Sequence, residues 1–153
     1  MDKKIGLFWL RDDFRIAKND GLAEATYNHD KVVVFYLYKE GIFKEQQAQK
    51  WWLNKSLLNF EKQLNKLNIN LEIVETKSFK IFFDKLVKKN DFSIYWNKVY
   101  EPEFLKFDEY LLSSFKNKNI VSKRFKGNAL NEIHEVKKND GTPFRVFTPF
   151  WRV

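Results

Sequence analysis

The feature that most constrains this sequence is a regular alternation between short apolar runs and longer amphipathic segments. The apolar runs have the length and bulk of buried strands, and the second is rich in β-branched and aromatic residues. Strands that alternate with helices predict a parallel sheet covered by helices on both faces, an α/β, Rossmann-like, doubly wound architecture. We expect five strands, at residues 5–10, 31–38, 68–74, 91–96 and 120–125.

The segments between these runs carry the signals of helices. A helix is expected from about Asn19, and another over residues 48–67. Ser78 can cap a shorter helix, and Pro102 stands at a first-turn position of a fourth. The long helix and the fourth helix show apolar stripes at three- and four-residue spacing, which predict their buried faces. These stripes are Leu53, Leu57, Phe60, Leu64 and Leu67, and then Phe104, Phe107, Leu111 and Phe115.

Right-handed crossovers restrict the order of the strands, and we expect 3-2-1-4-5. This order places the first and fourth strands side by side in the middle of the sheet. Residues 10–14 and 97–102, which follow these strands, then meet at one rim. Ligands of open α/β sheets bind at the carboxyl ends of such strands, so this rim is the first place to look for a site.

A charged cluster, Arg11–Arg15 (RDDFR), follows the first strand. One interpretation is a solvated turn in which Arg11, Asp13 and Arg15 pair with each other, because exposed ion pairs are common and weak. The other interpretation is that these residues orient a ligand or dock a second domain, since planar, bidentate pairing suits both roles. The sequence leaves both open.

Three other side chains near the predicted rim have more than one interpretation. In the pair Trp51–Trp52, one indole is expected in the core, and the other needs solvent, a partner or a flat ligand. Glu101, after the fourth strand, either neutralises Lys98 or accepts a hydrogen bond from the N–H of a ligand ring.

Several classes of function are excluded or disfavoured by composition. The chain has no cysteine and only two histidines, His29 and His134, so a zinc site is not expected. The five glycines are scattered and cannot form a glycine-rich phosphate loop. The net charge of +8 comes mostly from dispersed lysines, whereas nucleic-acid binding needs clustered charge. Without a membrane-spanning run or a signal peptide, the expected location is the cytoplasm.

The carboxyl-terminal segment is rich in aromatic residues: Phe144, Phe147, Phe150 and Trp151 follow the last predicted strand, and no further element remains to cover them. A contiguous exposed apolar patch usually marks an interface. Either the tail folds back on the sheet, or it begins a connection to another domain, which we favour. Self-association through this aromatic tail is a further possibility.

Four segments, in this order and spacing, resemble the amino-terminal α/β domain of the DNA photolyase/cryptochrome family. Trp9–Arg15 (WLRDDFR) resembles the family's Trp-x-Arg-x-Asp-Leu-Arg motif. Lys18–Leu22 (KNDGL) resembles Asp-Asn-x-Ala-Leu, with Lys in place of the first Asp. Tyr95–Pro102 (YWNKVYEP) is similar to the exit of the family's fourth strand, and Gly141–Trp151 (GTPFRVFTPFW) to the segment that ends this domain.

The resemblance implies that residues 1–136 form the light-harvesting domain and that residues 137–153 begin the connection to a helical FAD-binding domain absent from this chain. In the family that helical domain holds FAD and repairs a flipped pyrimidine dimer by electron transfer from excited reduced flavin. The resemblance therefore predicts the antenna domain of a deoxyribodipyrimidine photolyase, a blue-light-driven lyase of DNA repair, with no catalytic residue in this chain. The parent would bind damaged DNA. The alternative is a cryptochrome-like photoreceptor without repair activity.

The resemblance leaves the antenna open between methenyltetrahydrofolate, 8-hydroxy-5-deazaflavin and a flavin. Folate-type members carry Asn-Glu where this chain has Glu103–Phe104. Deazaflavin-type members carry Arg in place of Asp12 and an acid in place of Val99, although Glu101 agrees with them. The expected lining of the antenna site is Arg11, Tyr36, Leu37, Trp52 and Glu101. The expected interdomain contacts are Asp13, Arg15, Phe150 and Trp151.

Overall fold

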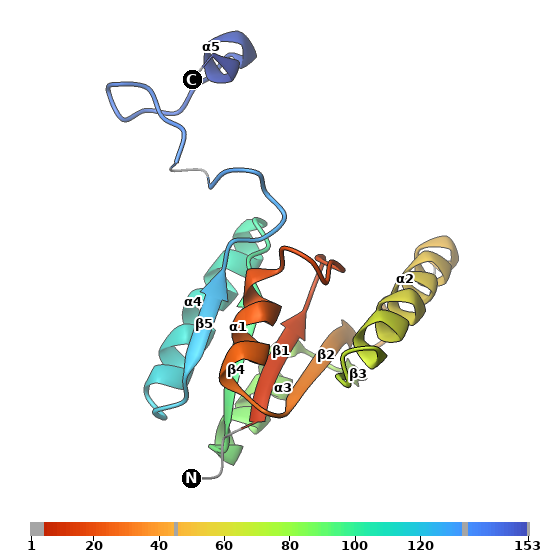
Figure 1. The fold of residues 1–153 in the computed structure, drawn as a ribbon. Coiled ribbons are helices and arrows are strands. Elements are labelled where there is room, and N and C mark those ends of the chain that lie inside the picture. The colour runs from red at the N-terminus through yellow and green to blue at the C-terminus, as the bar shows by residue number, and fades with distance from the viewer. Residues whose placement is uncertain (1–4, 45, 133–134, 153) are drawn as a thin grey trace.

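A computed structural model describes residues 5–44, 46–132 and 135–152 of the 153-residue chain (Figure 1). Strands and helices alternate along it as predicted, and the strands form one sheet. The elements are β1 (Ile5–Leu10), α1 (Asp20–Asn28), β2 (Val32–Lys39), α2 (Gln47–Asn65), β3 (Asn70–Thr76), α3 (Phe79–Leu86), the 3-10 turn η1 (Val87–Lys89), β4 (Phe92–Asn97), α4 (Pro102–Lys116), β5 (Ser122–Phe125) and α5 (Phe147–Trp151).

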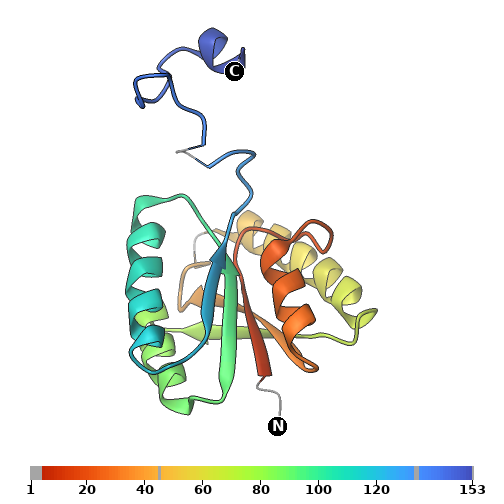
Figure 2. The same cartoon turned by 60° about the vertical axis from the view of Figure 1, so that its left-hand side comes forward.

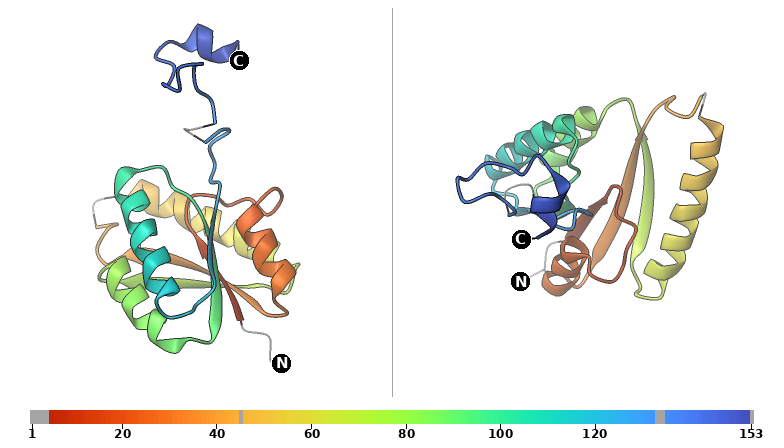
Figure 3. Two further views of the ribbon diagram at one scale, coloured as in Figure 1. Left: turned by 90° about the vertical axis from the view of Figure 1, so that its left-hand side faces the viewer. Right: turned by 90° about the horizontal axis from the view of Figure 1, so that it is seen from above.

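The sheet has five parallel strands in the order β3-β2-β1-β4-β5, which confirms the predicted topology. In β1, Leu10 pairs in register with Tyr36 of β2, and Trp9 pairs with Trp96 of β4. The exits of β1, β2 and β4 therefore lie side by side at the carboxyl rim. Helices cover both faces of the sheet (Figures 2 and 3).

Helices α1 and α2 cover one face. Leu22 and Ala25 of α1 and the stripe of α2 pack there on alternate residues of the strands, such as Phe8 and Leu10. In α2, Leu57, Phe60 and Leu64 are buried as predicted. The prediction that Leu67 belongs to this stripe is wrong. Helix α2 ends at Asn65, and Leu67 lies in the following turn with 51% of its surface exposed.

Helices α3 and α4 cover the other face with a cluster dominated by aromatic rings. Its centre is Phe83 of α3, whose ring lies edge-on to Trp9 with the ring centroids 4.8 Å apart. Four further rings lie within 6.3 Å of Phe83: Phe35, Phe82, Phe107 and Phe115. The indole of Trp9, on the central strand β1, therefore packs within this aromatic cluster.

The chain leaves the sheet after β5 through one close backbone contact. A Cβ atom on Gly127 would lie 2.0 Å from the carbonyl oxygen of Lys98, so only glycine fits there. The Gly127 N–H donates to the hydroxyl of Tyr100, which itself donates to Glu132. Lys98 also pairs with Glu132. These contacts fasten the segment after β5 to the exit of β4.

Beyond this fastening, α5 lies apart from the α/β body, past the carboxyl rim (Figures 1 and 2). Phe147 and Trp151 stack on each other but keep 70% and 74% of their surfaces exposed. Phe150 contacts Phe144 within the same segment. The tail thus does not fold back on the sheet, which was the first of the two possibilities that the sequence left open.

His134, one of the two histidines, lies outside the described residues. Within residues 5–44, 46–132 and 135–152, every helix is too short or too polar to cross a lipid bilayer.

Candidate functional site

Arg11, the first residue after β1, is buried at the centre of the carboxyl rim with only 7% of its surface exposed. Its guanidinium donates to both carboxylate oxygens of Asp108 of α4, at 3.0 and 3.2 Å, and to the backbone carbonyl of Asn97. It lies over the ring of Trp9, 4.7 Å from the centroid, and 5.7 Å from that of Phe104. Its Nε–H has no hydrogen-bond partner among the described residues.

Asp108 is completely buried and lies between two arginines. It pairs bidentately with Arg11 and, at 3.6 Å, with Arg124 of β5, which also pairs with Glu109. Burial raises the pKa of Asp108, and the two guanidinium groups oppose this shift. Burial likewise lowers the pKa of Arg11, against the attraction of Asp108. Each buried charge compensates the other, and the ion pair can therefore connect the end of β1 to α4.

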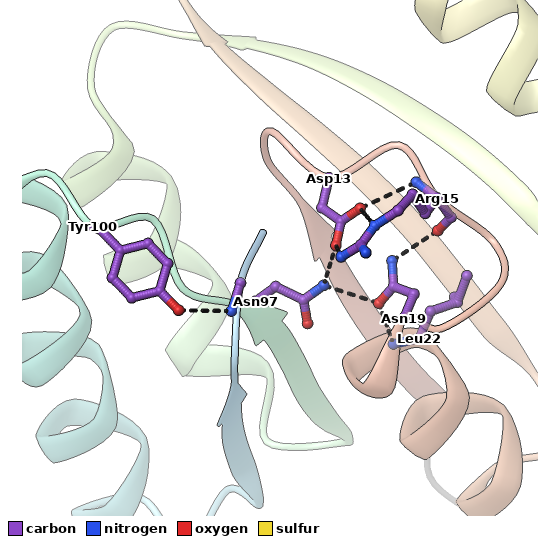
Figure 4. Close-up of polar contacts among 7 residues, drawn as sticks. Asp13, Arg15, Asn19, Leu22, Asn97 and Tyr100 are labelled. Carbon is purple, nitrogen blue, oxygen red and sulfur yellow. Dashed lines mark hydrogen bonds and ion pairs between the residues drawn. The ribbon is translucent and has the colours of Figure 1, made fainter. Parts of the chain in front are cut away.

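A second network joins the exits of β1 and β4 around Asp13 (Figure 4). Arg15 donates from Nε and a terminal nitrogen to the two oxygens of Asp13, each at 2.6 Å. Asn97 donates to Asp13 at 3.3 Å and to Asn19 at 2.9 Å. The side chain of Asn19 also caps α1 by accepting from the N–H of Leu22. The network therefore couples the charged loop to the start of α1.

The ionisation of the Asp13 carboxyl group should make the free energy of unfolding of the domain depend on pH. Burial alone would raise the pKa of Asp13, but the hydrogen bonds from Arg15 outweigh it and lower this pKa below 3.8. A carboxylate with a lowered folded-state pKa stabilises the fold above its unfolded value and loses that contribution as pH falls through the folded value. We expect Asp13→Asn to make the free energy of unfolding less dependent on pH below about 4.

Urea unfolding of the wild type and of Asp13→Asn at pH 7 and at pH 3 measures this effect. The difference in stability between the two proteins should shrink at the lower pH. Equal differences at both values of pH would contradict the lowered pKa.

Two grooves flank the exit of β2. The outer groove, of about 770 Å³, lies between β2, β3 and the first half of α2. The inner groove, of about 260 Å³, lies between the exits of β1 and β2 and the starts of α3 and α4. Tyr36, Tyr38 and Phe43 line both, so the two grooves adjoin each other around one strand end.

The inner groove has aromatic walls and one buried cation. Trp9, Phe79 and Phe104 line it together with Arg11 and Leu37. Such walls suit a planar apolar ring, and the few polar groups set its orientation. Burial raises the pKa of Tyr36, so its hydroxyl stays protonated at neutral pH and can donate a hydrogen bond. In the described part of the chain, no cluster of three or more His, Asp or Glu side chains could hold a metal ion.

The outer groove is more open and more polar. Trp51 stands on its α2 side, together with Lys44 and Lys50, while Ile73 and Glu75 of β3 form the opposite side. An aromatic ring beside two lysines can accept the flat or the anionic part of a ligand.

The residues predicted to line an antenna site divide into two groups. The structure brings Arg11, Tyr36 and Leu37 together at the inner groove. Trp52 and Glu101 line neither groove. Trp52 has 66% of its surface exposed, and Glu101 is an exposed residue at the start of α4.

One expectation about these side chains is wrong, and one of the two alternatives for Glu101 does not hold. Neither Trp51 nor Trp52 belongs to the core, because the buried stripe of α2 begins only with the half-buried Leu53 and both indoles precede it. Lys98 pairs with Glu132 rather than with Glu101. The charged loop also pairs differently from the first interpretation: Asp13 and Arg15 do pair, but Arg11 reaches Asp108 instead.

The predicted interdomain residues occupy two places. Asp13 and Arg15 meet at the carboxyl rim, where half of the Arg15 side chain is exposed. Phe150 and Trp151 belong to α5, apart from the body.

Sequence reasoning missed Asp108 and Asn97. Asp108 occupies a position four residues after Phe104 and three before Leu111, inside the apolar stripe of α4. An acid at an inward position of an amphipathic helix is the signal that could have identified it, since buried carboxylates require a partner. Asn97 gave no such signal, because strand ends commonly carry asparagine.

Comparison with known proteins places this geometry in a family. The model of the family described as DNA photolyase matches residues 6–153. A deoxyribodipyrimidine photo-lyase of Agrobacterium fabrum is 27% identical over 95% of this chain and 30% of its own length. Cryptochrome-2 of Arabidopsis thaliana is 28% identical over 99% of this chain and 25% of its own length. The chain thus spans about a quarter to a third of these relatives.

Solved structures agree with this placement. A bacterial class III photolyase from Agrobacterium tumefaciens matches with a TM-score of 0.85 and 26% identity, over 99% of this chain and 32% of the other. An archaeal photolyase from Sulfolobus tokodaii, described with two FAD molecules, matches with a TM-score of 0.72 over 97% of this chain and 34% of the other. At 20% identity, this second likeness concerns the fold alone.

Proposed function

Since the chain belongs to the DNA photolyase family, as the amino-terminal α/β domain found in photolyases and cryptochromes, we propose that it is the antenna-chromophore-binding domain of a deoxyribodipyrimidine photolyase. The parent would use FAD in a following domain to repair pyrimidine dimers in DNA under blue light. The proposal places this flavoprotein in the cytoplasm. The cryptochrome relative favours a second candidate, a blue-light photoreceptor without repair activity.

The observation that carries the proposal is the inner groove with its orphaned donor. The groove offers aromatic walls for a planar ring. The buried Nε–H of Arg11 lacks a partner among the described residues, and buried donors are nearly always satisfied. If the atoms that cover this donor moved aside on binding, a carbonyl oxygen or ring nitrogen of a folate, deazaflavin or flavin could supply the missing acceptor. Arg11, Tyr36 and Leu37 form the core of the proposed site, while Trp52 and Glu101 would contact only parts of the pigment outside the grooves.

The proposal assigns the rest of the chain to the connection with the FAD domain. Residues 1–136 would form the antenna domain, and residues 137–153 would begin the connection. The exposed aromatic rings of Phe150 and Trp151 support an interface, because a monomeric surface rarely leaves such rings uncovered. Asp13 and Arg15 would meet the following domain at the carboxyl rim. A second copy of the chain is the other partner that the aromatic tail could bind.

Titration of the chain with methenyltetrahydrofolate, 8-hydroxy-5-deazaflavin and flavin mononucleotide tests the pigment site. We expect one of them to bind with a stoichiometry near one and a shifted visible absorption band. Tyr36→Ala should weaken that binding by about tenfold or more, since the ring lines both grooves. Tyr27→Ala is the matched control, because Tyr27 is 88% exposed on α1 and lines neither groove. Absence of binding by all three pigments would refute the proposed site.

The parent protein distinguishes the two candidate functions. A photolyase that contains this domain should bind FAD and should convert thymine dimers in DNA back to thymines under blue light. A parent that binds FAD but leaves the dimers intact would favour the photoreceptor.

A further inference from the structure

The wall of the inner groove depends on a residue that does not line it. Arg11, Trp9 and Phe104 belong to the lining, and Asp108 does not. The carboxylate of Asp108 lies behind this wall, fully buried, and holds the Arg11 guanidinium through two hydrogen bonds. We propose that Asp108 is a positioning residue of the pigment site, which fixes the Arg11 guanidinium over Trp9 and Phe104 and so sets the shape and the charge of the groove wall.

Asp108 fixes the position of the Arg11 guanidinium through two hydrogen bonds. A guanidinium has five N–H donors in a rigid fork, and a carboxylate that accepts two of them fixes the plane of the group. The backbone carbonyl of Asn97 is the second anchor, from the neighbouring strand. Nε is the one guanidinium nitrogen without a partner among the described residues, and its direction follows from these anchors.

Loss of the Asp108 carboxylate would reorient the wall of the inner groove. Arg11 and Arg124 both approach Asp108 and would face each other without an intervening negative charge. Arg124 retains Glu109 as a partner at 2.8 Å, whereas no other acidic group pairs with Arg11 in the described chain. Arg11 would keep only the Asn97 carbonyl as an anchor, so it is the group whose place over the rings of Trp9 and Phe104 would change.

Arg124 provides a matched control within the same cluster. It contacts the same carboxylate as Arg11, but it lines a different depression, with Tyr100 and Glu132, and not the inner groove. Arg124→Gln thus removes an ion pair of Asp108 without touching the wall. Arg11→Lys keeps the charge but loses the fork, and it serves as the second variant if Asp108→Asn fails to fold.

The first measurement needs no pigment. In the ¹⁵N-labelled chain, the assigned indole N–H resonance of Trp9 reports the guanidinium above its ring. We expect this resonance to shift in Asp108→Asn and in Arg11→Lys and to stay in place in Arg124→Gln. An unchanged Trp9 resonance in a folded Asp108→Asn or Arg11→Lys chain, or an equal shift in Arg124→Gln, would overturn the proposal.

The second measurement rests on the proposed function and uses whichever of methenyltetrahydrofolate, 8-hydroxy-5-deazaflavin and flavin mononucleotide the wild type binds. Asp108→Asn and Arg11→Lys should raise its Kd by about tenfold or more and shift its absorption band, whereas Arg124→Gln should leave both unchanged. Unchanged binding in the first two variants would overturn the positioning role. A wild type that binds none of the three would refute the proposed function, and the Trp9 resonance would still decide the role of Asp108.

Discussion

Replacement of Asp108 by asparagine is expected to lower the free energy of unfolding by about 3–5 kcal/mol, because it leaves buried guanidinium charge without compensation. Asp108 has no exposed surface and ties α4 to β1 and β5. The substitution keeps the volume of the side chain, so the loss reports charge rather than packing. Guanidinium chloride unfolding at pH 7 measures it.

Asp84→Asn is the matched control for this prediction. Asp84 also pairs with a cation, Lys80, but the pair lies on the surface of α3, where water solvates both charges. The same substitution there should change stability far less, since exposed pairs contribute little. Similar losses in the two variants would show that the Arg11–Asp108 pair is not held in a dry interior.

Phe83→Ala is expected to lower the free energy of unfolding by about 3–5 kcal/mol through the cavity it leaves in the core. Among the described residues, Phe83 is the one ring that contacts Trp9, Phe35 and Phe115 together, and only 1% of its surface is exposed. The cavity would open behind Trp9, at the back of the inner groove. Chemical unfolding again provides the measurement.

Phe147→Ala removes the same atoms from an exposed position in α5. We expect it to change the stability of the α/β body by no more than about 0.5 kcal/mol, as surface substitutions do. If Phe147→Ala proved as destabilising as Phe83→Ala, then the tail would pack on the body in solution.

The sheet could be predicted from the sequence because its signals are local. The central strands β1, β2 and β4 are apolar runs. The helices of the α/β body begin at a capping residue or a first-turn proline, as with Asn19, Ser78 and Pro102, or carry an apolar stripe. The strand order followed from the handedness of crossovers, and with it the meeting of the Arg11 and Asn97 loops at one rim. These rules need no knowledge of individual side-chain partners.

The site was only partly predictable, because its partners are distant in the sequence. Asp108 stands 97 residues after Arg11, and nothing local to either residue specifies the pair. The roles of Trp51 and Trp52 depended on where the buried stripe of α2 begins, a boundary that periodicity leaves uncertain by a turn. The grooves themselves arise from the spacing between α2 and β3 and between α3 and the β1 exit, which tertiary packing determines.

The contact of Gly127 with the Lys98 carbonyl, together with the hydrogen bonds of Tyr100, couples the segment after β5 mechanically to the exit of β4. Glu132 bonds to Lys98 and Tyr100, so a force on this segment acts on the exit of β4 as well as on β5. The carbonyl of Asn97, which holds Arg11, is one residue from that anchor point. The segment after β5 is therefore connected, through the exit of β4, to one of the two anchors of the cation that faces the inner groove.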